Sequence, residues 1–265
     1  MASKKKKKSP ISTESKIIAV VSDIHFDLHH VPAWNAFMQW HADVKPHKTI
    51  VLGDFVDLGM MSQWKMGTDD PVYAVPQIRA CIEQMNILVK QCDELIMMEG
   101  NHDERWDKVV KSHGPALKGA LGLTLREQFF SQGLDPAVTY MKEDTKNKGV
   151  RVGNWILRHG HRQGRGWGPK HLAYNRLVNN MFENEIFGHY HKAQMFAHTA
   201  NGRTATAIAN PCLTGDHDYA TDPQWQRGFT VVELYGPDNM YSNARPIVMN
   251  DGGHFAYNGK VYGGK

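Results

Sequence analysis

The chain has 265 residues, 41% of them hydrophobic and 22% charged, which is typical of a folded globular protein and excludes wholesale disorder. No apolar run approaches the roughly 18 residues of a membrane-spanning helix, so we expect no membrane partner. Three cysteines cannot build a disulfide framework, and we expect a reducing, cytoplasmic compartment.

The net charge of +4 comes from one end of the chain. Removing the five positive charges of the run Lys4–Lys8 from +4 leaves −1 for the rest of the protein. Residues 1–14 are predicted to be a flexible basic arm, which either contacts nucleic acid or only increases solubility. Residues 15–265 are predicted to form one domain.

The first half of that domain alternates strands and helices. Short apolar runs predict buried strands at 17–21, 49–52 and 95–98. Helical spacing of apolar residues predicts helices at 32–42 and 75–92, with Cys81 and Cys92 as core thiols on the second. This alternation is typical of a parallel α/β sheet.

The second half contains more strand than helix. We expect helices at 123–131 and 169–182. Single strands are predicted at 150–158, 184–187, 204–209, 229–234 and 246–249.

Polar side chains follow five of the predicted strands, at the point where each strand ends. In chain order these side chains are Asp23, His25, Asp54, Asp57, Asn101, His102, Asp103, His159, His161, His189 and His191. Because ligands bind at the carboxyl ends of strands in open α/β sheets, we expect these groups to meet in one crevice. Each motif alone has a structural explanation, such as a turn aspartate or a helix cap. Five motifs in order favour a functional site.

The spacing of these residues suits metal ions. Asp23 and His25 are two residues apart, as are His189 and His191, so in extended backbone each pair points to one side. The candidate ligands are Asp23, His25, Asp54, Asn101, His159, His189 and His191. One ion needs about four to six ligands, so this set predicts two ions that share a carboxylate. Oxygen and imidazole donors without thiolate favour manganese, with iron, zinc, nickel or magnesium as alternatives.

The order Asp-x-His, Gly-Asp-x-x-Asp, Gly-Asn-His-Asp, His and Gly-His-x-His, between Asp23 and His191, resembles the calcineurin-like metallophosphoesterase superfamily. The resemblance implies a four-layer α/β/β/α sandwich of two mixed sheets flanked by helices, with a dinuclear metal centre. It implies that the first ion is held by Asp23, His25 and His191, and the second by Asn101, His159 and His189. It also implies that Asp54 bridges the ions and that Asp57 orients His102, the general acid.

The mechanism expected from this arrangement is attack on phosphorus by a metal-bridging hydroxide, with His102 protonating the leaving oxygen. Leu58 and Asp103 stand where the Ser/Thr protein phosphatases have arginine and glutamate, so a phosphoprotein substrate is not expected. The Gly-Asn-His-Asp form is closer to phosphodiesterases and to SbcD-like DNA exonucleases.

A basic, glycine-rich segment follows His159. Between Trp155 and Phe182 there is no acidic residue. The candidate substrate-binding residues are Arg105, His161, Arg162, Arg165 and Trp167, which would grip a phosphate backbone and stack a base. The alternative is a solvated arginine-rich helix face with a packing tryptophan. His161 is also a second candidate for the role of His159, and the polar segment 210–218 is expected to form another wall of the cleft.

The sequence therefore predicts a phosphodiesterase with two divalent ions, acting on nucleic acid as a nuclease or on nucleotides. One alternative is a phosphomonoesterase acting on nucleotides or small phosphates. The other is a non-catalytic nucleic-acid-binding protein whose metal site is structural.

Overall fold

The computed structural model describes residues 14–62, 74–114, 120, 122–143, 149–162, 170–179, 183–217 and 223–264. Except for Glu14, the predicted basic arm lies outside these residues. No helix in these ranges is both long enough and apolar enough to cross a membrane.

A six-stranded mixed sheet forms the larger half of the fold, in the order β11-β10-β1-β2-β3-β4. Its strands are β1 (Lys16–Val21), β2 (Lys48–Leu52), β3 (Glu94–Glu99), β4 (Thr139–Lys142), β10 (Gly228–Tyr235) and β11 (Tyr241–Val248). The first four run parallel, while β10 and β11 add antiparallel pairs at one edge. The carboxyl ends of β1, β2 and β3 therefore open at the same edge of the sheet.

A five-stranded mixed sheet forms the other half, in the order β5-β6-β7-β9-β8. Its strands are β5 (Val150–Val152), β6 (Trp155–Arg158), β7 (Asn184–Phe187), β8 (Gln194–Ala200) and β9 (Arg203–Ala209). The central strands β6, β7 and β9 are parallel, and both edge strands pair antiparallel.

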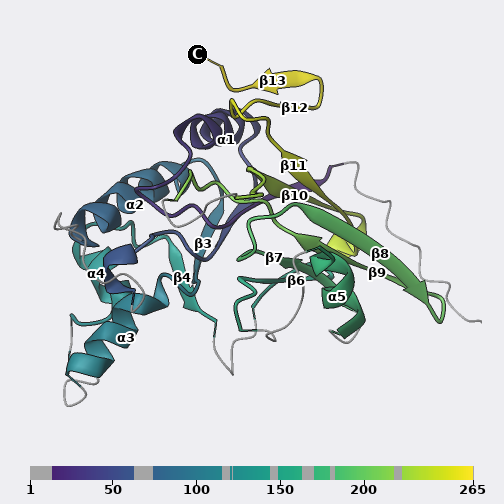
Figure 1. Cartoon of the computed structure of the whole chain (residues 1–265). Coiled ribbons are helices and arrows are strands. Elements are labelled where there is room, and N and C mark those ends of the chain that lie inside the picture. The colour runs from purple at the N-terminus through teal and green to yellow at the C-terminus, as the bar shows by residue number, and fades with distance from the viewer. Residues whose placement is uncertain are drawn as a thin grey trace, which may run out of the picture.

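Helices cover the outer faces of both sheets (Figure 1). The helices are α1 (Val31–Val44), α2 (Ala74–Leu88), α3 (Glu104–His113), α4 (Leu125–Ser131) and α5 (Leu172–Asn179), with short 3-10 turns η1 (Gly59–Met61) and η3 (Pro237–Asn239). A terminal hairpin of β12 (Phe255–Tyr257) and β13 (Lys260–Tyr262) lies beside α1.

The side chains of β1 show how the layers are held together. Ala19 and Val21 pack in a core shared with α1, α2 and α4, whereas Ile18 and Val20 pack between the two sheets. This alternation follows from the two-residue period of a strand. Each fully buried valine or isoleucine stabilises the fold by about 1.5–3 kcal/mol. On the far side, Phe187 of β7 packs with α5, so the predicted four-layer α/β/β/α sandwich is confirmed.

Two helix starts show the local signals that set their boundaries. Pro32 occupies the first turn of α1, and the His30 ring accepts a hydrogen bond from the Ala33 N–H. Thr124 and Glu127 form a reciprocal capping box at the start of α4.

The single strand predicted at 150–158 is wrong, because the structure has a hairpin there. β5 and β6 are antiparallel and joined by Gly153 and Asn154, with Gly153 at a φ of 55°. A left-handed glycine followed by asparagine is a turn signal that outweighs the β-branched residues on either side.

The helix predicted at 75–92 is shorter than expected, since α2 ends at Leu88. Cys81 is buried in the core, as predicted, but Cys92 lies beyond the helix and is only half-buried. Its thiol donates a hydrogen bond to the Leu88 carbonyl at 3.3 Å. The expected helix at 169–182 is present as α5, and residues 169 and 180–182 lie outside the described residues.

Candidate metal centre

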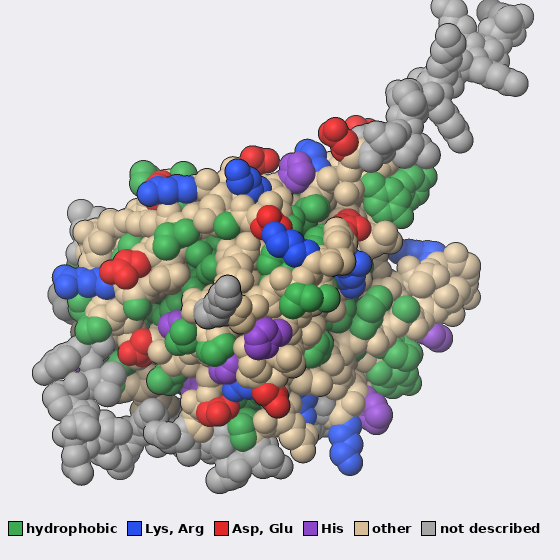
Figure 2. Space-filling view, turned by 90° about the horizontal axis from the view of Figure 1, so that it is seen from above, with side chains coloured by type: hydrophobic (Ala, Val, Ile, Leu, Met, Phe, Trp, Pro, Cys, Tyr) green, Lys and Arg blue, Asp and Glu red, His purple; other side chains and the backbone are tan. Residues whose placement is uncertain are grey.

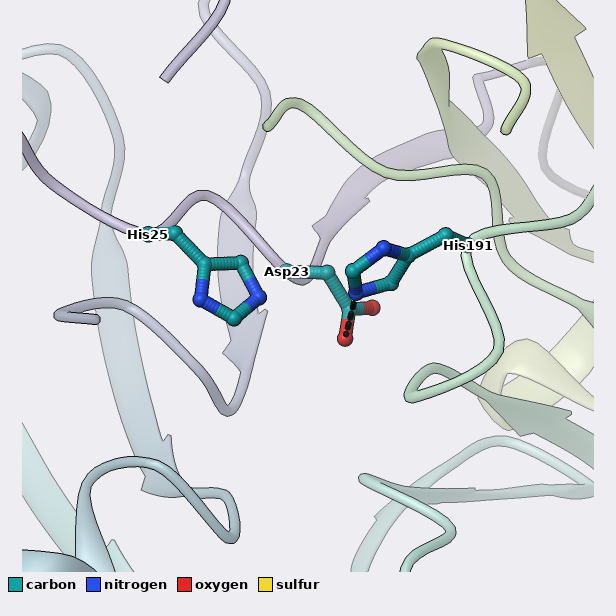
Figure 3. A group of neighbouring side chains, drawn as sticks. All are labelled: Asp23, His25 and His191. Atoms are coloured by element: carbon teal, nitrogen blue, oxygen red, sulfur yellow. Dashed lines mark ion pairs between the residues drawn. The ribbon is translucent and has the colours of Figure 1, made fainter. Parts of the chain in front are cut away.

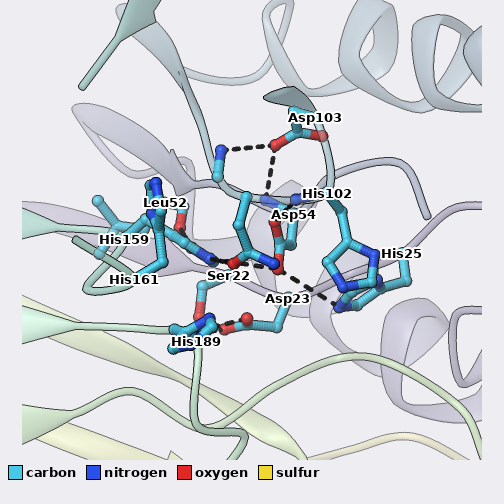
Figure 4. Close-up of polar contacts among 12 residues, drawn as sticks. Ser22, Asp23, His25, Leu52, Asp54, His102, Asp103, His159, His161 and His189 are labelled. Atoms are coloured by element: carbon cyan, nitrogen blue, oxygen red, sulfur yellow. Dashed lines mark hydrogen bonds and ion pairs between the residues drawn. The ribbon is translucent and has the colours of Figure 1, made fainter. Parts of the chain in front are cut away.

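The segments that follow β1, β2, β3, β6 and β7 meet at one place between the two sheets (Figure 4). The Asp23 N–H donates to the Gly53 carbonyl at 3.0 Å, which joins the ends of β1 and β2. The His189 N–H donates to both carboxylate oxygens of Asp23 at 3.0 Å, which joins the two sheets. These hydrogen bonds bring the predicted motifs into one crevice.

The first group of possible ligands contains Asp23, His25 and His191. One donor atom from each lies within 4.8 Å of the others. Figure 3 shows the His191 ring facing the Asp23 carboxylate, with Nε2 and Oδ1 at 3.3 Å. All three residues are buried, so this group is shielded from bulk water.

The second group contains Asp54, His159 and His189, again with donor atoms within 4.8 Å of one another. His159 Nε2 lies 3.2 Å from Asp54 Oδ2 and 3.0 Å from the side-chain oxygen of Asn101. Asp54 Oδ2 is also 3.9 Å from His25 Nε2 in the first group. Asp54 therefore lies between the two groups, and the structure brings together all seven predicted ligand residues.

A third group places His102 and Asp57 beside the first. His102 Nδ1 is 3.1 Å from Asp57 Oδ1 and 2.9 Å from the Asp57 carbonyl oxygen. Arg105 donates to the same carbonyl at 2.8 Å and lies 3.1 Å from His102 Nε2. Because a guanidinium can only donate, His102 accepts at Nε2 here and carries its proton on Nδ1.

Several buried ring nitrogens at this place lack a hydrogen-bond partner. Within the described part of the chain, His25 Nε2 and His189 Nδ1 have no hydrogen-bond partner, whereas His25 Nδ1 lies 3.3 Å from Asp57 Oδ1. A buried polar atom left unpaired costs about 1–3 kcal/mol, and a cation bound to it removes that cost. Imidazole nitrogens and carboxylate or amide oxygens are donors that suit divalent transition metals. These residues therefore fit two divalent ions.

The charges in the two groups respond to each other. Burial alone would raise the pKa of Asp23, but His191 and His159 lower it to about 2. Burial would lower the pKa of His159, yet Asp54 raises it to about 10. Burial and the neighbouring His159 lower the pKa of His189 to about 4. The carboxylates thus remain ionised and attract positive charge into the crevice.

Burial and neighbouring charges also oppose each other in setting the pKa values of His102 and Asp57. Burial would lower the pKa of His102, but Asp54 and Asp57 raise it above its usual value. Burial would raise the pKa of Asp57, but hydrogen bonds from His102 and His25 lower it instead. The two carboxylates favour a charged His102 imidazole, whereas the Arg105 guanidinium opposes that charge and pairs with the neutral ring.

The backbone at the site is held in an unusual conformation. The φ angles of Asp23, His25, Asp54, His189 and His191 are all positive, between 52° and 74°. Such left-handed conformations cost about 1–3 kcal/mol per residue and persist only where the surrounding structure fixes them.

Two glycines allow the close approach of the loops. A Cβ on Gly53 would lie 2.6 Å from His159 Nδ1, and a Cβ on Gly188 would lie 2.8 Å from an Asp23 carboxylate oxygen. No larger residue fits at either position without moving a proposed ligand.

Asp103 has a supporting role that the sequence did not reveal. Its buried carboxylate accepts hydrogen bonds from the backbone N–H groups of Asp54 and Gly100 at 2.7 Å and of Val56 at 3.2 Å. Burial and the nearby Asp54 raise the pKa of Asp103 well above its usual range. Asp103 therefore connects the loop after β2 to the loop after β3. The only indication of this role in the sequence was the position of Asp103 at the end of the Gly-Asn-His-Asp motif.

His217 was also missed. Its ring lies 5.1 Å from that of His25, its Nε2 is 2.6 Å from Thr214 Oγ1, and its Nδ1 is 3.9 Å from Asp57 Oδ1. Trp225 packs against the rings of His191 and His217. Only the polar, turn-rich composition of 210–218 indicated this wall.

The predicted substrate-binding residues lie at different places. Arg105 contacts His102, as described above. His161 Nε2 is 3.2 Å from Glu104 Oε1, and Arg162 pairs with the same carboxylate. The His161 ring lies 5.2 Å from that of His159, so His161 is at the rim of the second group. Arg165 and Trp167 lie outside the described residues.

Comparison with known structures finds a distant similarity to three Vps29 proteins. Vps29 of Cryptosporidium parvum is 15% identical with a TM-score of 0.47, over 93% of this chain and 94% of that one. Zinc-bound wild-type Vps29 of Entamoeba histolytica is 13% identical with a TM-score of 0.43, over 88% of this chain and 98% of that one. Vps29 of Chaetomium thermophilum is 11% identical with a TM-score of 0.43, over 88% of this chain and 97% of that one. These values are too low to transfer a function.

Two comparisons with protein sequences give different outcomes. No curated protein matches this chain. The model of the calcineurin-like phosphoesterase family matches residues 17–193, which include every proposed metal ligand and more than half of the chain. The chain belongs to the calcineurin-like phosphoesterase family.

Proposed function

We propose that this protein is a metal-dependent phosphoesterase that uses two divalent ions, most readily Mn²⁺, to hydrolyse phosphodiester bonds in nucleic acid or nucleotides. The observation that carries the proposal is the position of Asp54 between the two groups of ligands, 3.2 Å from His159 and 3.9 Å from His25, with His102 beside them. Family membership supports the same class of reaction.

The ligand roles follow from the grouping. Asp23, His25 and His191 would hold one ion, and Asn101, His159 and His189 the other, with Asp54 shared between them. When bound, two divalent ions supply an activated water and neutralise the charge on the phosphate oxygens. The ionised carboxylates keep the imidazole rings oriented toward the ions.

His102 supplies the proton for the leaving oxygen. Asp57 holds its Nδ1 at 3.1 Å, so Nε2 is the atom that faces the substrate. When both ring nitrogens carry protons, Nε2 no longer accepts from Arg105, and the guanidinium is free to donate to a phosphate oxygen. Arg105 would therefore both stabilise the neutral imidazole in the free protein and contact the substrate.

The preference for a diester rests on two observations. The Gly-Asn-His-Asp form, with Leu58 and Asp103 in place of the protein-phosphatase residues, resembles that of phosphodiesterases. A cleft also opens beside Asn101 and Arg105, which leaves room for a large ester group.

The test is hydrolysis of a diester and a monoester by the purified chain. The protein is stripped with a chelator, reloaded with Mn²⁺, and assayed with bis-p-nitrophenyl phosphate and p-nitrophenyl phosphate. We expect the diester to be the better substrate, and both Asp54→Asn and His102→Gln to lower kcat by at least about 100-fold. The control is His47→Gln, an exposed histidine before β2.

Three results would contradict the proposal. A clear preference for the monoester would indicate the phosphomonoesterase. Full activity in Asp54→Asn would exclude the proposed centre. No hydrolysis with any divalent ion would favour a binding protein with a structural metal site.

A further inference from the structure

A groove leads away from the metal centre along helix α3. The residues that line it are Met60, Met61, Ser62, Asn101, Arg105, Lys108, Val109, Ser112 and His113, and its volume is about 660 Å³. The α3 residues among them recur every three or four positions, so they belong to one face of the helix. Asn101 joins the groove to the metal centre, and Met60 and Met61 of η1 line it together with α3.

The lining combines positive charge with apolar surface. Arg105 and Lys108 carry the charge, Met60 and Met61 give apolar surface, and none of the described lining residues is acidic. By contrast, basic and acidic side chains are interspersed on the face of the molecule seen in Figure 2.

Lys108 is able to bind a ligand. Its ammonium group lies 3.0 Å from Glu104 Oε2, but 63% of its side chain is exposed to solvent. An exposed ion pair between residues four apart on a helix contributes only about 0.3–0.5 kcal/mol. A ligand phosphate can therefore compete for this lysine.

The position of the groove relative to His102 indicates what it would hold. Arg105 lines the groove and also lies 3.1 Å from His102 Nε2. In the proposed reaction His102 protonates the leaving oxygen, so the leaving group departs on this side. The groove therefore begins where the leaving group would lie. This step rests on the proposed function.

We propose that the α3 groove binds a single-stranded nucleic acid on the leaving-group side of the cleaved bond. From Arg105 to His113 the helix rises about 12 Å, at 1.5 Å per residue, which is longer than one phosphate requires. Cationic side chains would follow the backbone, and the methionines would pack on the flat apolar faces of unpaired bases. A volume of about 660 Å³ is in the range of small-ligand pockets and suits a short piece of strand better than a duplex.

The experiment compares two lysines on the same helix. Lys108 lines the groove, whereas Lys111 is exposed on α3 and is not among the lining residues. Full-length wild type, Lys108→Gln and Lys111→Gln, all loaded with Mn²⁺, are assayed on a ten-nucleotide single strand over a range of salt concentrations. We expect the slope of log KM against log salt to decrease by about 0.7 in Lys108→Gln, as for the loss of one phosphate contact, and to be unchanged in Lys111→Gln.

Hydrolysis of bis-p-nitrophenyl phosphate by the same preparations separates this inference from the proposed function. If the small diester is cleaved but both lysine variants have the wild-type slope, the groove proposal is wrong and the phosphoesterase stands. Preference for a duplex or for a phosphopeptide over the single strand would also overturn it.

If no substrate is cleaved, binding of the fluorescently labelled strand to each variant is measured by fluorescence anisotropy and tests the groove proposal instead. Binding that weakens in Lys108→Gln but not in Lys111→Gln supports the groove without the enzyme. Binding that is absent, or equally strong in both variants, overturns the proposal.

Discussion

Asp103 offers a direct test of how the loops of the metal centre are held. Its buried carboxylate accepts three backbone N–H groups, from Asp54, Val56 and Gly100. Asp103→Ala removes both acceptor oxygens and with them all three hydrogen bonds. Each buried donor left unsatisfied costs about 1–3 kcal/mol, so we expect a loss of at least about 3 kcal/mol in the free energy of unfolding. That is a large part of the 5–15 kcal/mol typical of a folded protein.

The assay is urea unfolding in the presence of a chelator, followed by circular dichroism and tryptophan fluorescence. Asp103→Asn is a milder variant that should keep part of the hydrogen bonding. Its single amide oxygen can still accept from Asp54 and Gly100, and only the bond to Val56 is lost. Asp93→Ala, at an exposed aspartate, is the control and should change stability by no more than about 0.5 kcal/mol.

The order of stability therefore tests the reasoning. We expect wild type and Asp93→Ala to be the most stable, Asp103→Asn intermediate and Asp103→Ala the least stable. If Asp103→Ala unfolds at the same urea concentration as wild type with the same slope, the carboxylate does not hold these loops.

Three further predictions concern other parts of the chain. His41 is buried between Thr49 and Gln91, and burial lowers its pKa to about 4, so its contribution to stability is complete above pH 6.5 and is lost as the pH falls from 6.5 through 4. The loss of stability is at most about 3 kcal/mol. In His41→Asn the urea midpoint should therefore change less between pH 6.5 and pH 4 than in wild type. The same pH dependence in both proteins would show that His41 is not the group responsible. Mn²⁺ should raise the Tm of wild type by a concentration-dependent amount that is lost in Asp54→Asn, and an equal rise in both proteins would place the ions elsewhere. Gly53→Ala, at a φ of 82° and with its Cβ 2.6 Å from the His159 ring, should lower Mn²⁺ affinity in calorimetry by about tenfold or more, and wild-type affinity would contradict the proposed crowding.

The central strands and the meeting of the motifs were predictable because both depend on short-range patterns. β1, β2 and β3 are continuous apolar runs buried on both faces, and each is followed at once by its polar motif. Since parallel strands end at the same edge, the order of motifs already implied their convergence.

Elements with little burial left no such signal. Helix α3 has no buried residue and is polar overall, and β8 is mostly exposed, so neither stands out by its apolar content. The hairpin of β5 and β6 was hidden because residues on both sides of Gly153 favour strands.

Contacts between distant segments were also out of reach. His217 lies near His25 only because the chain returns to the first sheet, and the sequence has no motif for this contact. Likewise, Asp103 supports Asp54 from 49 positions away. Such roles depend on how the loops meet in three dimensions and not on spacing in the sequence.

The most direct test of the account is to locate the ions. We predict that a crystal of the Mn²⁺-loaded protein gives two peaks in an anomalous difference map, about 3.5–4 Å apart, with the Asp54 carboxylate between them. A single peak, or peaks that do not contact Asp54, would contradict the dinuclear centre.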